Sequence, residues 1–375
     1  MKTEIATDTV IKKICNTFRI EGEYIGFSPV EMGNINKTYK AHFIRDGLEK
    51  NYIVQKINTF VFNEPVNIMK NVTLITKHIH DKVAKNNGDT KRCAVRYFTT
   101  ADDKNYHIAE NGDFWRVSRC VADSISFNTG ENAKILHGAG AAFGEFQMLL
   151  SDFDASKLAI TIKDFHNTPV RLKSLFDAAK RDEAGRAAEV ASDLEWFYSI
   201  ADEASRLENM RLSGEVRERV THNDTKVNNV LFDKNSKDPL VVVDLDTVMP
   251  GLAMHDFGDA VRSAANTCEE DETDLDKVEF DLDRYTSFAE GFISKTAHAL
   301  EKREIETMAL GALTITVELA SRFLADYING DKYFKTLREK HNLDRARCQL
   351  KLASDISKKM DEMNEIVKKI AESAG

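Results

Sequence analysis

Short apolar runs alternate with polar turns over the first third of the chain, which predicts β-strands. The runs are rich in β-branched and aromatic residues, and Asp46-Gly47 between two of them is a hairpin signal. The strand-like runs are 24–27, 38–44, 52–57, 94–99, 106–109 and 114–121, and one helical run covers 65–85. The first third is therefore predicted to be a five- or six-stranded antiparallel sheet with one long helix.

From residue 131 onward, apolar positions recur mostly at helical spacing, around one compact non-helical stretch at 220–260. The predicted helices are 133–151, 170–181, 187–213, 283–303, 305–329 and 344–374. This order predicts an α+β fold with two lobes, an antiparallel-sheet lobe at 1–121 and a mainly helical lobe at 122–375. The chain has no internal repeat or low-complexity linker, so the lobes are expected to pack closely.

Composition narrows the classes of function. The chain has 375 residues, 42% of them hydrophobic, and a net charge of -9, which argues against disorder and against broad contact with nucleic acid or anionic lipid. The five cysteines are far apart in sequence and suggest reduced thiols. The N-terminus is polar and periodic, and no run approaches the roughly 20 apolar residues of a membrane span. We expect a cytoplasmic protein without nucleic-acid or membrane partners.

The segment His222-Asn223-Asp224-Thr225-Lys226-Val227-Asn228-Asn229 carries polar groups suited to phosphoryl transfer. That reaction needs a carboxylate at the attacking hydroxyl and oxygen ligands for magnesium on the phosphates. Asp224 can orient an acceptor hydroxyl, and the side-chain oxygen of Asn229 can bind the metal. A His-x-Asp pair on its own more often caps a loop.

Two further acids follow a predicted hairpin. The apolar runs 230–232 and 240–243 flank a turn-rich connection, so the hairpin would return Asp244 to Asn229. Asp244 and Asp246 face the same side of an extended segment, where a divalent cation would relieve their repulsion. An Asp-x-Asp pair alone is usually turn chemistry. The two motifs in this order favour a magnesium-dependent kinase.

Together these residues resemble the aminoglycoside phosphotransferase and choline kinase superfamily, whose members have a protein-kinase-like fold. The resemblance begins near residue 20 and implies ATP as co-substrate and Mg²⁺ as cofactor. It also implies a role for each matching residue. Asp224 would be the catalytic base that also contacts the substrate, Asn229 and Asp244 the magnesium ligands, Asp246 an accessory acid at the metal, His222 a brace of the loop and Asp256 its anchor.

A narrower resemblance is to the N-acetylhexosamine 1-kinases. It lies in segments 33–39, 164–171, 244–251 and 322–331. It implies transfer of the ATP γ-phosphate to the anomeric hydroxyl of N-acetylglucosamine or N-acetylgalactosamine. The alternatives left open are another acceptor, such as choline, an amino alcohol, an aminoglycoside or another sugar, and a nucleotide-binding pseudokinase.

On the nucleotide side, the segment Gly33-Asn34-Ile35-Asn36 lies between two strands, where kinases place a flap over the phosphates. Its single glycine is also compatible with a plain hairpin. Lys56 lies on the third strand, where kinases place a phosphate-binding lysine, but the following helix has no glutamate in its middle. The predicted nucleotide-binding residues are Gly33, Asn34, Asn36 and Lys56.

On the acceptor side, Arg322 and Asp326 lie one turn apart on a predicted helix. They could contact the sugar or each other, and the resemblance favours a sugar contact for Arg322. Segment 164–169 precedes a helix and could cap it or contact substrate. The sequence predicts a small-molecule sugar as partner and leaves the oligomeric state open.

Overall fold

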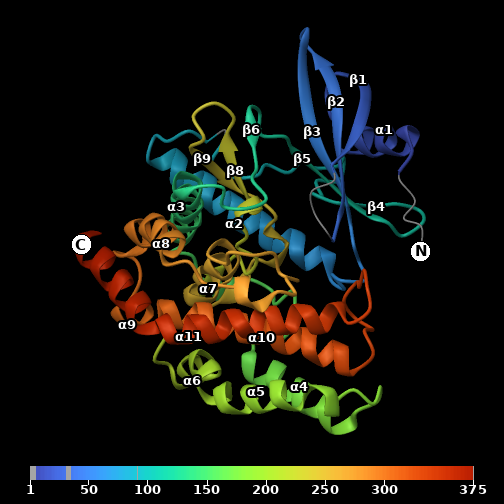
Figure 1. Cartoon of the computed structure of the whole chain (residues 1–375). Coiled ribbons are helices and arrows are strands. Elements are labelled where there is room, and N and C mark those ends of the chain that lie inside the picture. The colour runs from blue at the N-terminus through green and yellow to red at the C-terminus, as the bar shows by residue number, and fades with distance from the viewer. Residues whose placement is uncertain (1–5, 31–34, 91, 375) are drawn as a thin grey trace.

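The computed structural model describes residues 6–30, 35–90 and 92–374. An antiparallel sheet at the N-terminal end stands over a larger, mainly helical part (Figure 1). This is the two-part α+β architecture that the sequence predicts. The boundary predicted after residue 121 stays a prediction. The sheet's last strand ends at Arg119, and Ser124–Ile125 (β6) already pairs with a strand of the helical part.

Five strands of the described chain form the N-terminal sheet, in the order β1-β2-β3-β5-β4. All neighbouring strands of this sheet are antiparallel, since the chain reverses its direction between each pair. The strands are β1 Glu23–Val30, β2 Lys37–Arg45, β3 Leu48–Ile57, β4 His107–Ile108 and β5 Phe114–Arg119. The strand predicted at 94–99 is wrong. In this run only Tyr97 forms a β-bridge, to Ser118 near the end of β5, whereas β4 pairs with Phe114 and Trp115 at the start of β5.

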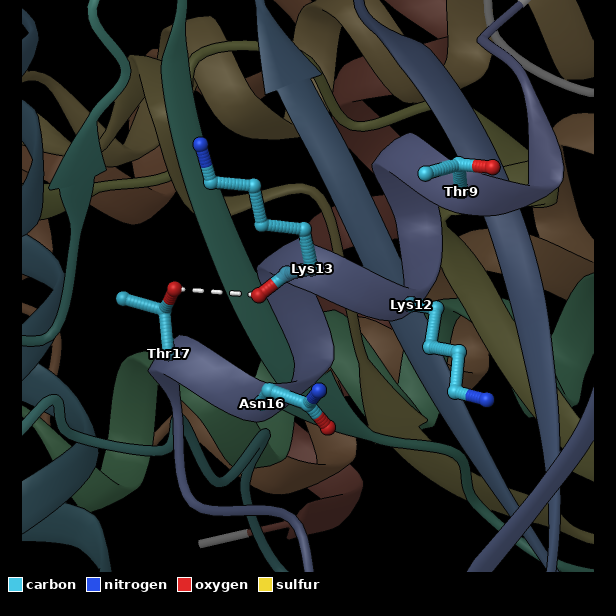
Figure 2. A pocket seen from close by; sticks show the side chains of 5 residues that line it. All are labelled: Thr9, Lys12, Lys13, Asn16 and Thr17. Carbon is cyan, nitrogen blue, oxygen red and sulfur yellow. Dashed lines mark hydrogen bonds between the residues drawn. The ribbon is translucent and has the colours of Figure 1, made fainter.

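The two faces of the sheet have different neighbours. Helix α1 (Asp8–Thr17) buries Ile11 and Ile14 against one face, in a cluster with Val54 and Trp115. A shallow hollow lies on the outer side of this helix, lined by Thr9, Lys12, Lys13, Asn16 and Thr17 (Figure 2). Helix α2 (Pro65–Lys85) joins the main core instead, so it connects the sheet to the helical part.

The helical part is built mainly from α3 to α11. Its helices are α3 Ala133–Leu149, α4 Thr168–Arg181, α5 Ala191–Ala204, α6 Arg206–Ser213, α7 Ala253–Ala264, α8 Leu282–Thr296, α9 Lys302–Glu306, α10 Met308–Ile328 and α11 His341–Ala374. Two predicted helices are each divided in the structure. The helix predicted at 187–213 is interrupted at Ser205, and the helix predicted at 283–303 stops at Thr296, before α9 begins. The second break follows from local chemistry, since Glu301 and Glu304 form a capping box that starts α9.

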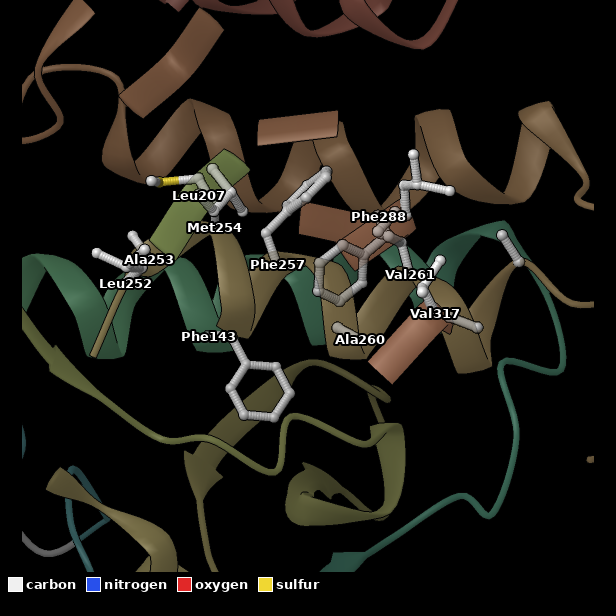
Figure 3. Packing of buried hydrophobic residues seen from close by; sticks show 14 of the residues in the cluster. Phe143, Leu207, Leu252, Ala253, Met254, Phe257, Ala260, Val261, Phe288 and Val317 are labelled. Atoms are coloured by element: carbon white, nitrogen blue, oxygen red, sulfur yellow. The ribbon is translucent and has the colours of Figure 1, made fainter. Parts of the chain in front are cut away.

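Helices α7 and α10 cross at very short range. A Cβ on Gly258 would lie 2.2 Å from the Gly311 carbonyl oxygen, and one on Gly311 would lie 1.9 Å from the Met254 carbonyl oxygen. Only glycine allows this approach. Phe257, Phe288 and Val317 belong to the cluster that surrounds the crossing (Figure 3). Helix α7 begins at Ala253, so the prediction of a non-helical stretch at 220–260 extends too far toward the C-terminus.

Helix α10 corrects one expectation from the sequence. By length and composition it is apolar enough to cross a membrane, with a mean hydropathy of 1.4. However, 83% of that window is buried inside the protein. Its apolar side chains therefore pack in the core, as a central helix requires.

The stretch between α6 and α7 carries short strands. Strand β8 (Val230–Asp233) pairs with β9 (Pro239–Val242), which confirms the predicted hairpin. Strand β7 (Arg219–Thr221) pairs with β10 (Met249–Gly251). These two pairs bring the segment after β7 and the segment after β9 together beneath the N-terminal sheet.

Candidate active site

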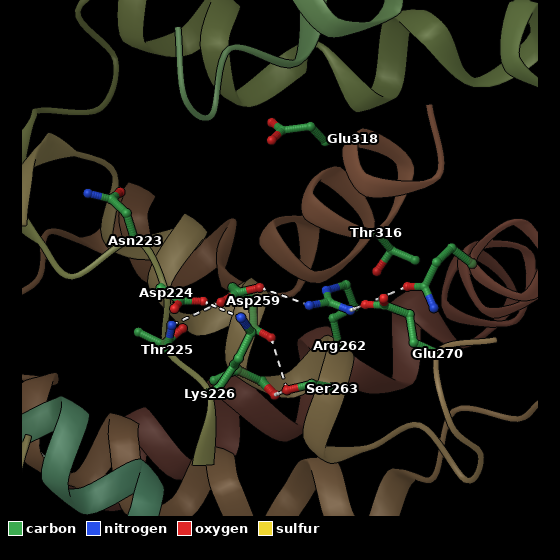
Figure 4. A network of polar contacts seen from close by, with 12 residues as sticks. Asn223, Asp224, Thr225, Lys226, Asp259, Arg262, Ser263, Glu270, Thr316 and Glu318 are labelled. Atoms are coloured by element: carbon green, nitrogen blue, oxygen red, sulfur yellow. Dashed lines mark hydrogen bonds and ion pairs between the residues drawn. The ribbon is translucent and has the colours of Figure 1, made fainter. Parts of the chain in front are cut away.

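The loop that follows β7 is held by carboxylates of α7. Asp256 accepts the backbone N–H groups of His222 and Asn223, at 2.8 and 2.7 Å, and Asp259 accepts that of Thr225 at 2.9 Å. Asn223 has φ 64°, a left-handed conformation that asparagine tolerates better than most residues. The backbone on both sides of Asp224 is therefore fixed by α7, and Figure 4 shows Asp259 beside Asp224 and Thr225.

His222 links this loop to the end of β9. Its Nδ1 lies 3.3 Å from the N–H of Asp224, so Nδ1 accepts and Nε2 carries the proton. Nε2 then donates to the Val243 carbonyl at 2.9 Å. His222 thus contacts backbone groups beside both Asp224 and Asp244, which is compatible with the bracing role predicted for it.

The Asp224 carboxylate is partly exposed, with 26% of its side chain accessible. Its Oδ1 lies 2.8 Å from Lys226 Nζ, and its Oδ2 lies 3.3 Å from the amide nitrogen of Asn229. The carboxylate is therefore oriented by two donors while it stays open to a ligand. Burial opposes the charge on Lys226, but Asp224 and Asp259 raise the pKa of that ammonium.

Asn229 and Asp244 lie beside each other, as the hairpin predicts. The N–H of Val243 donates to the Asn229 carbonyl at 2.8 Å. The side-chain amide of Asn229 donates to the Asp224 carbonyl at 2.8 Å, which leaves its Oδ1 for another group. Desolvation by neighbouring atoms, followed by the charges of Asp246 and Asp224, raises the pKa of Asp244 to about 6, although the residue itself is exposed at the surface. A cation here would relieve this repulsion.

Asp246 is nearly inaccessible, and both its oxygens have protein donors. Arg116 Nη1 donates to Oδ1, and the Asn36 side-chain nitrogen donates to Oδ2 at 2.6 Å. Both donors come from the N-terminal sheet. The metal contact predicted for Asp246 stays a prediction, and these contacts compete with it.

A family model described as "Phosphotransferase enzyme family" matches residues 87–288, which is more than half of the chain. The chain belongs to this phosphotransferase family. The matched range contains the loop with Asp224 and both acids after β9.

Solved structures share the fold of this phosphotransferase. An aminoglycoside phosphotransferase from Alicyclobacillus acidocaldarius is similar with a TM-score of 0.61 and 12% identity, over 100% of this chain and 98% of the other. A choline kinase from Cryptosporidium parvum gives 0.58 and 12%, over 96% and 98%. A spectinomycin phosphotransferase, solved with ADP and spectinomycin, gives 0.55 and 12%, over 99% of both chains. At this identity the likeness establishes the fold alone.

The residues fit the magnesium that the family resemblance implies. Asn229 and Asp244 offer oxygen ligands, which magnesium prefers, and the negative charges of Asp246 and Asp224 lie close enough to act on Asp244. Within the described residues, no group of three or more His, Cys, Asp or Glu forms a metal site alone. Magnesium in this phosphotransferase would therefore need further oxygens, which nucleotide phosphates commonly supply.

The predicted nucleotide residues are not all brought together. Gly33 and Asn34 lie outside the described residues, whereas Asn36 reaches Asp246. Lys56 pairs with Asp113 at 2.5 Å. Successive residues of a strand point to opposite faces, so Lys56 shares the α1 face with Val54 and lies away from Asp246.

Two charged residues of the site are missing from the sequence predictions. Lys226 contacts Asp224, and its position two residues later in the same loop could have indicated it. Arg116 contacts Asp246 and is only 1% exposed. The sequence does signal Arg116, because it is the one charged residue in the apolar run Phe114-Trp115-Arg116-Val117 and a buried charge needs a partner.

The acceptor-side predictions are clarified in part. Asn167 accepts the Val170 N–H at 3.2 Å and caps α4, so the capping alternative for this segment is confirmed. Asp326 accepts the N–H groups of residues 332–334 and does not pair with Arg322. Arg322 instead lies over the Phe334 ring, at 5.5 Å from its centroid.

His166 joins the start of α4 to the loop with Asp224. Its Nδ1 lies 3.2 Å from a Glu318 carboxylate oxygen, and its Nε2 lies 3.2 Å from the Asn223 carbonyl oxygen. Both partners accept, so both ring nitrogens must donate and the imidazole is cationic. Burial opposes the charge, but Glu318 and Asp259 raise the pKa of His166 above 6.5, and the neighbouring His255 ring stays neutral because burial lowers its pKa.

This geometry predicts a stability contribution that depends on pH. A raised pKa in the folded state stabilises fully below the unfolded value and is lost as pH rises through the folded value. We expect the difference in free energy of unfolding between wild type and His166→Gln to shrink from pH 6 to pH 9. Urea unfolding at both values measures it, and a constant difference would contradict the cationic assignment.

Proposed function

We propose that this phosphotransferase transfers the γ-phosphate of ATP to the anomeric hydroxyl of an N-acetylhexosamine, with magnesium as cofactor. The observation that carries the acceptor choice is a pair of arginines, Arg171 and Arg322, beside the loop with Asp224. The nucleotide and the metal are supported by the family and by the donor set of Asn229 and Asp244.

Hydrogen bonds and helix position connect the arginines to the loop. Arg171 Nη2 donates to the Phe165 carbonyl at 3.2 Å, and the next residue, His166, donates to the Asn223 carbonyl. Arg322 lies one turn after Glu318, the other partner of His166. Burial, followed by the Arg322 guanidinium, lowers the pKa of Arg171, while Glu318 and Asp164 act in the opposite direction.

Two of the acids near these arginines, Glu318 and Asp326, are already occupied. Glu318 accepts from His166 and from the Thr168 hydroxyl, each at 3.2 Å. Asp326 is used by backbone N–H groups and by Asn342. Among the described residues Arg322 has no ion pair, and Nε of Arg171 has no hydrogen-bond partner.

Two guanidiniums beside one further acid, Asp164, suit a neutral polyol better than an amine. Guanidinium groups only donate, so they match hydroxyl and acetamide oxygens of a sugar. They repel a cationic acceptor, which needs acids or an aromatic cage. Similar structures named choline kinase and ethanolamine kinase are only 12% and 11% identical to this chain, so their names do not fix its acceptor.

The proposed chemistry uses the geometry around Asp224. Its carboxylate orients the acceptor hydroxyl and receives the proton, while Lys226 Nζ, 2.8 Å from Oδ1, holds the carboxylate in position. Asn229 and Asp244 would hold magnesium, which would neutralise charge on the phosphates. Asp224 and Asp244 are supported as separate groups by their different contacts, since Lys226 lies beside the Asp224 carboxylate whereas Asp246 and Asp224 are the charges that act most on Asp244.

An acceptor panel tests the proposal. Wild type with ATP and magnesium is expected to phosphorylate N-acetylglucosamine or N-acetylgalactosamine with a far higher kcat/KM than choline, ethanolamine or an aminoglycoside. A coupled assay of ADP release measures each rate. A clear preference for an amine would overturn the acceptor choice while leaving the kinase assignment in place.

For Arg322→Ala we expect the KM for the sugar to rise roughly 10- to 100-fold, because about 1.5–3 kcal/mol of charged hydrogen bonding is lost. The KM for ATP should stay near that of wild type. Arg181→Ala is the matched control, since Arg181 is an exposed residue at the end of α4 that pairs with Glu183. Equal effects of the two variants would refute a sugar contact by Arg322.

A further inference from the structure

A buried ion pair joins the N-terminal sheet to the turn after Asp244. Arg116 on β5 is 1% exposed, and its partner Asp246 is 2% exposed. The Arg116 guanidinium also donates through Nε to Gln55 on β3, at 2.9 Å, and lies over the Tyr97 ring. Such a pair is costly to bury, so its several contacts must fix one arrangement.

The turn is held from two sides. From the sheet, Arg116 and Asn36 occupy the two oxygens of Asp246, and Asn36 also accepts the Asn58 N–H at 3.0 Å. From the helical part, the Asn223 side chain donates to the Thr247 carbonyl at 2.9 Å. The turn therefore sits in a clamp between the sheet and the loop with Asp224.

Asp244 has an unusual backbone within this clamp. Its φ of 60° and ψ of 57° are left-handed, a region that residues other than glycine rarely adopt. Such a conformation persists where the surroundings hold it, often at functional sites. Two residues later, the side chain of Asp246 is held by Arg116 and Asn36.

We propose that Arg116 is a positioning residue that holds Asp244, through Asp246, in the conformation that binds the magnesium nucleotide. This inference rests on the proposed function, in which Asp244 is a magnesium ligand. Arg116 thus links the sheet directly to the loop that carries Asp244. Lys56, which the sequence predicted for the lysine role, lies on the other face of the sheet.

The alternative is an ion pair that contributes to folding alone. It predicts that losing Arg116 lowers stability and affects ligand binding no more than other broken ion pairs do. The positioning role predicts a specific loss of magnesium-dependent ATP affinity. A comparison with an equivalent ion pair elsewhere separates the two.

The experiment measures ATP affinity by calorimetry, with and without magnesium, together with the melting temperature. For Arg116→Gln we expect magnesium-dependent affinity to fall at least roughly tenfold, and Arg116→Lys should restore part of it. Arg219→Gln is the matched control, because Arg219 pairs with Glu304 in a similarly buried ion pair between β7 and α9. It should change affinity less than about twofold, whatever its melting temperature.

A double variant tests whether Arg116 acts through Asp246. The affinity loss of Arg116→Gln with Asp246→Asn should be clearly smaller than the summed losses of the single variants. Wild-type affinity in Arg116→Gln, or additive losses, would overturn the proposal. If Arg116→Gln does not fold, Arg116→Lys and Asp246→Asn carry the same comparison. These readouts use nucleotide binding alone, so a failure of the sugar assignment is seen separately, as ATP binding without sugar phosphorylation.

Discussion

Replacing Asp224 with Asn is expected to lower kcat by roughly 10²–10⁴-fold, the usual contribution of a positioned base. Asparagine keeps the size of the side chain and an oxygen that can accept from Lys226, but it cannot receive the acceptor's proton. Because Asn229 and Asp244 are unchanged, ATP binding with magnesium should stay within about twofold of wild type. Steady-state kinetics and calorimetry measure the two quantities.

The control for this prediction is Asp238→Asn. Asp238 lies in the connection between β8 and β9, and its side chain is 65% exposed in an ion pair with Lys134. The same chemical change there should leave turnover at the wild-type level. An Asp224→Asn variant that turns over like this control would show that Asp224 is not the base.

The second large effect is expected at Asp244. The conservative change is Asp244→Asn, because asparagine tolerates the left-handed φ of 60° better than alanine. We expect ATP affinity to become the same with and without magnesium, since the charged ligand is lost. Calorimetry with magnesium or with a chelator measures this directly.

The same variant should not be less stable. Desolvation by neighbouring atoms and the charges of Asp246 and Asp224 already disfavour an ionised Asp244, even though the residue is exposed, so a neutral side chain relieves repulsion. A melting temperature equal to or above that of wild type is expected at pH 7. If Asp244→Asn keeps magnesium-dependent ATP binding, the ligand assignment is wrong, whatever its stability.

The parts of the fold that the sequence predicts are those set by local pattern. Helix α2 matches its predicted range, since apolar spacing and Pro65 define it. The hairpin of β8 and β9 follows from two apolar runs and a turn-rich connection. The run at 94–99 has the same local pattern but lies next to only the end of β5. The availability of a partner strand, rather than β-propensity, therefore decides whether this run forms a strand.

The active site is predictable only where its residues are close in sequence. Asp224 and Asn229 share one loop, and a short hairpin returns Asp244 to them. Arg116 lies 130 positions from Asp246, so no local pattern could pair them. The position of Lys56 on the third strand was clear, but which face it occupies depends on the packing of α1.

The central claim is phosphoryl transfer from ATP to an anomeric hydroxyl. The most direct measurement is phosphorus NMR of the product formed from a reducing N-acetylhexosamine, compared with its 1-O-methyl glycoside, in which that hydroxyl is blocked. The account predicts a sugar 1-phosphate that requires magnesium and Asp224, and no product from the glycoside. Phosphorylation of the glycoside at a rate like that of the free sugar would contradict it.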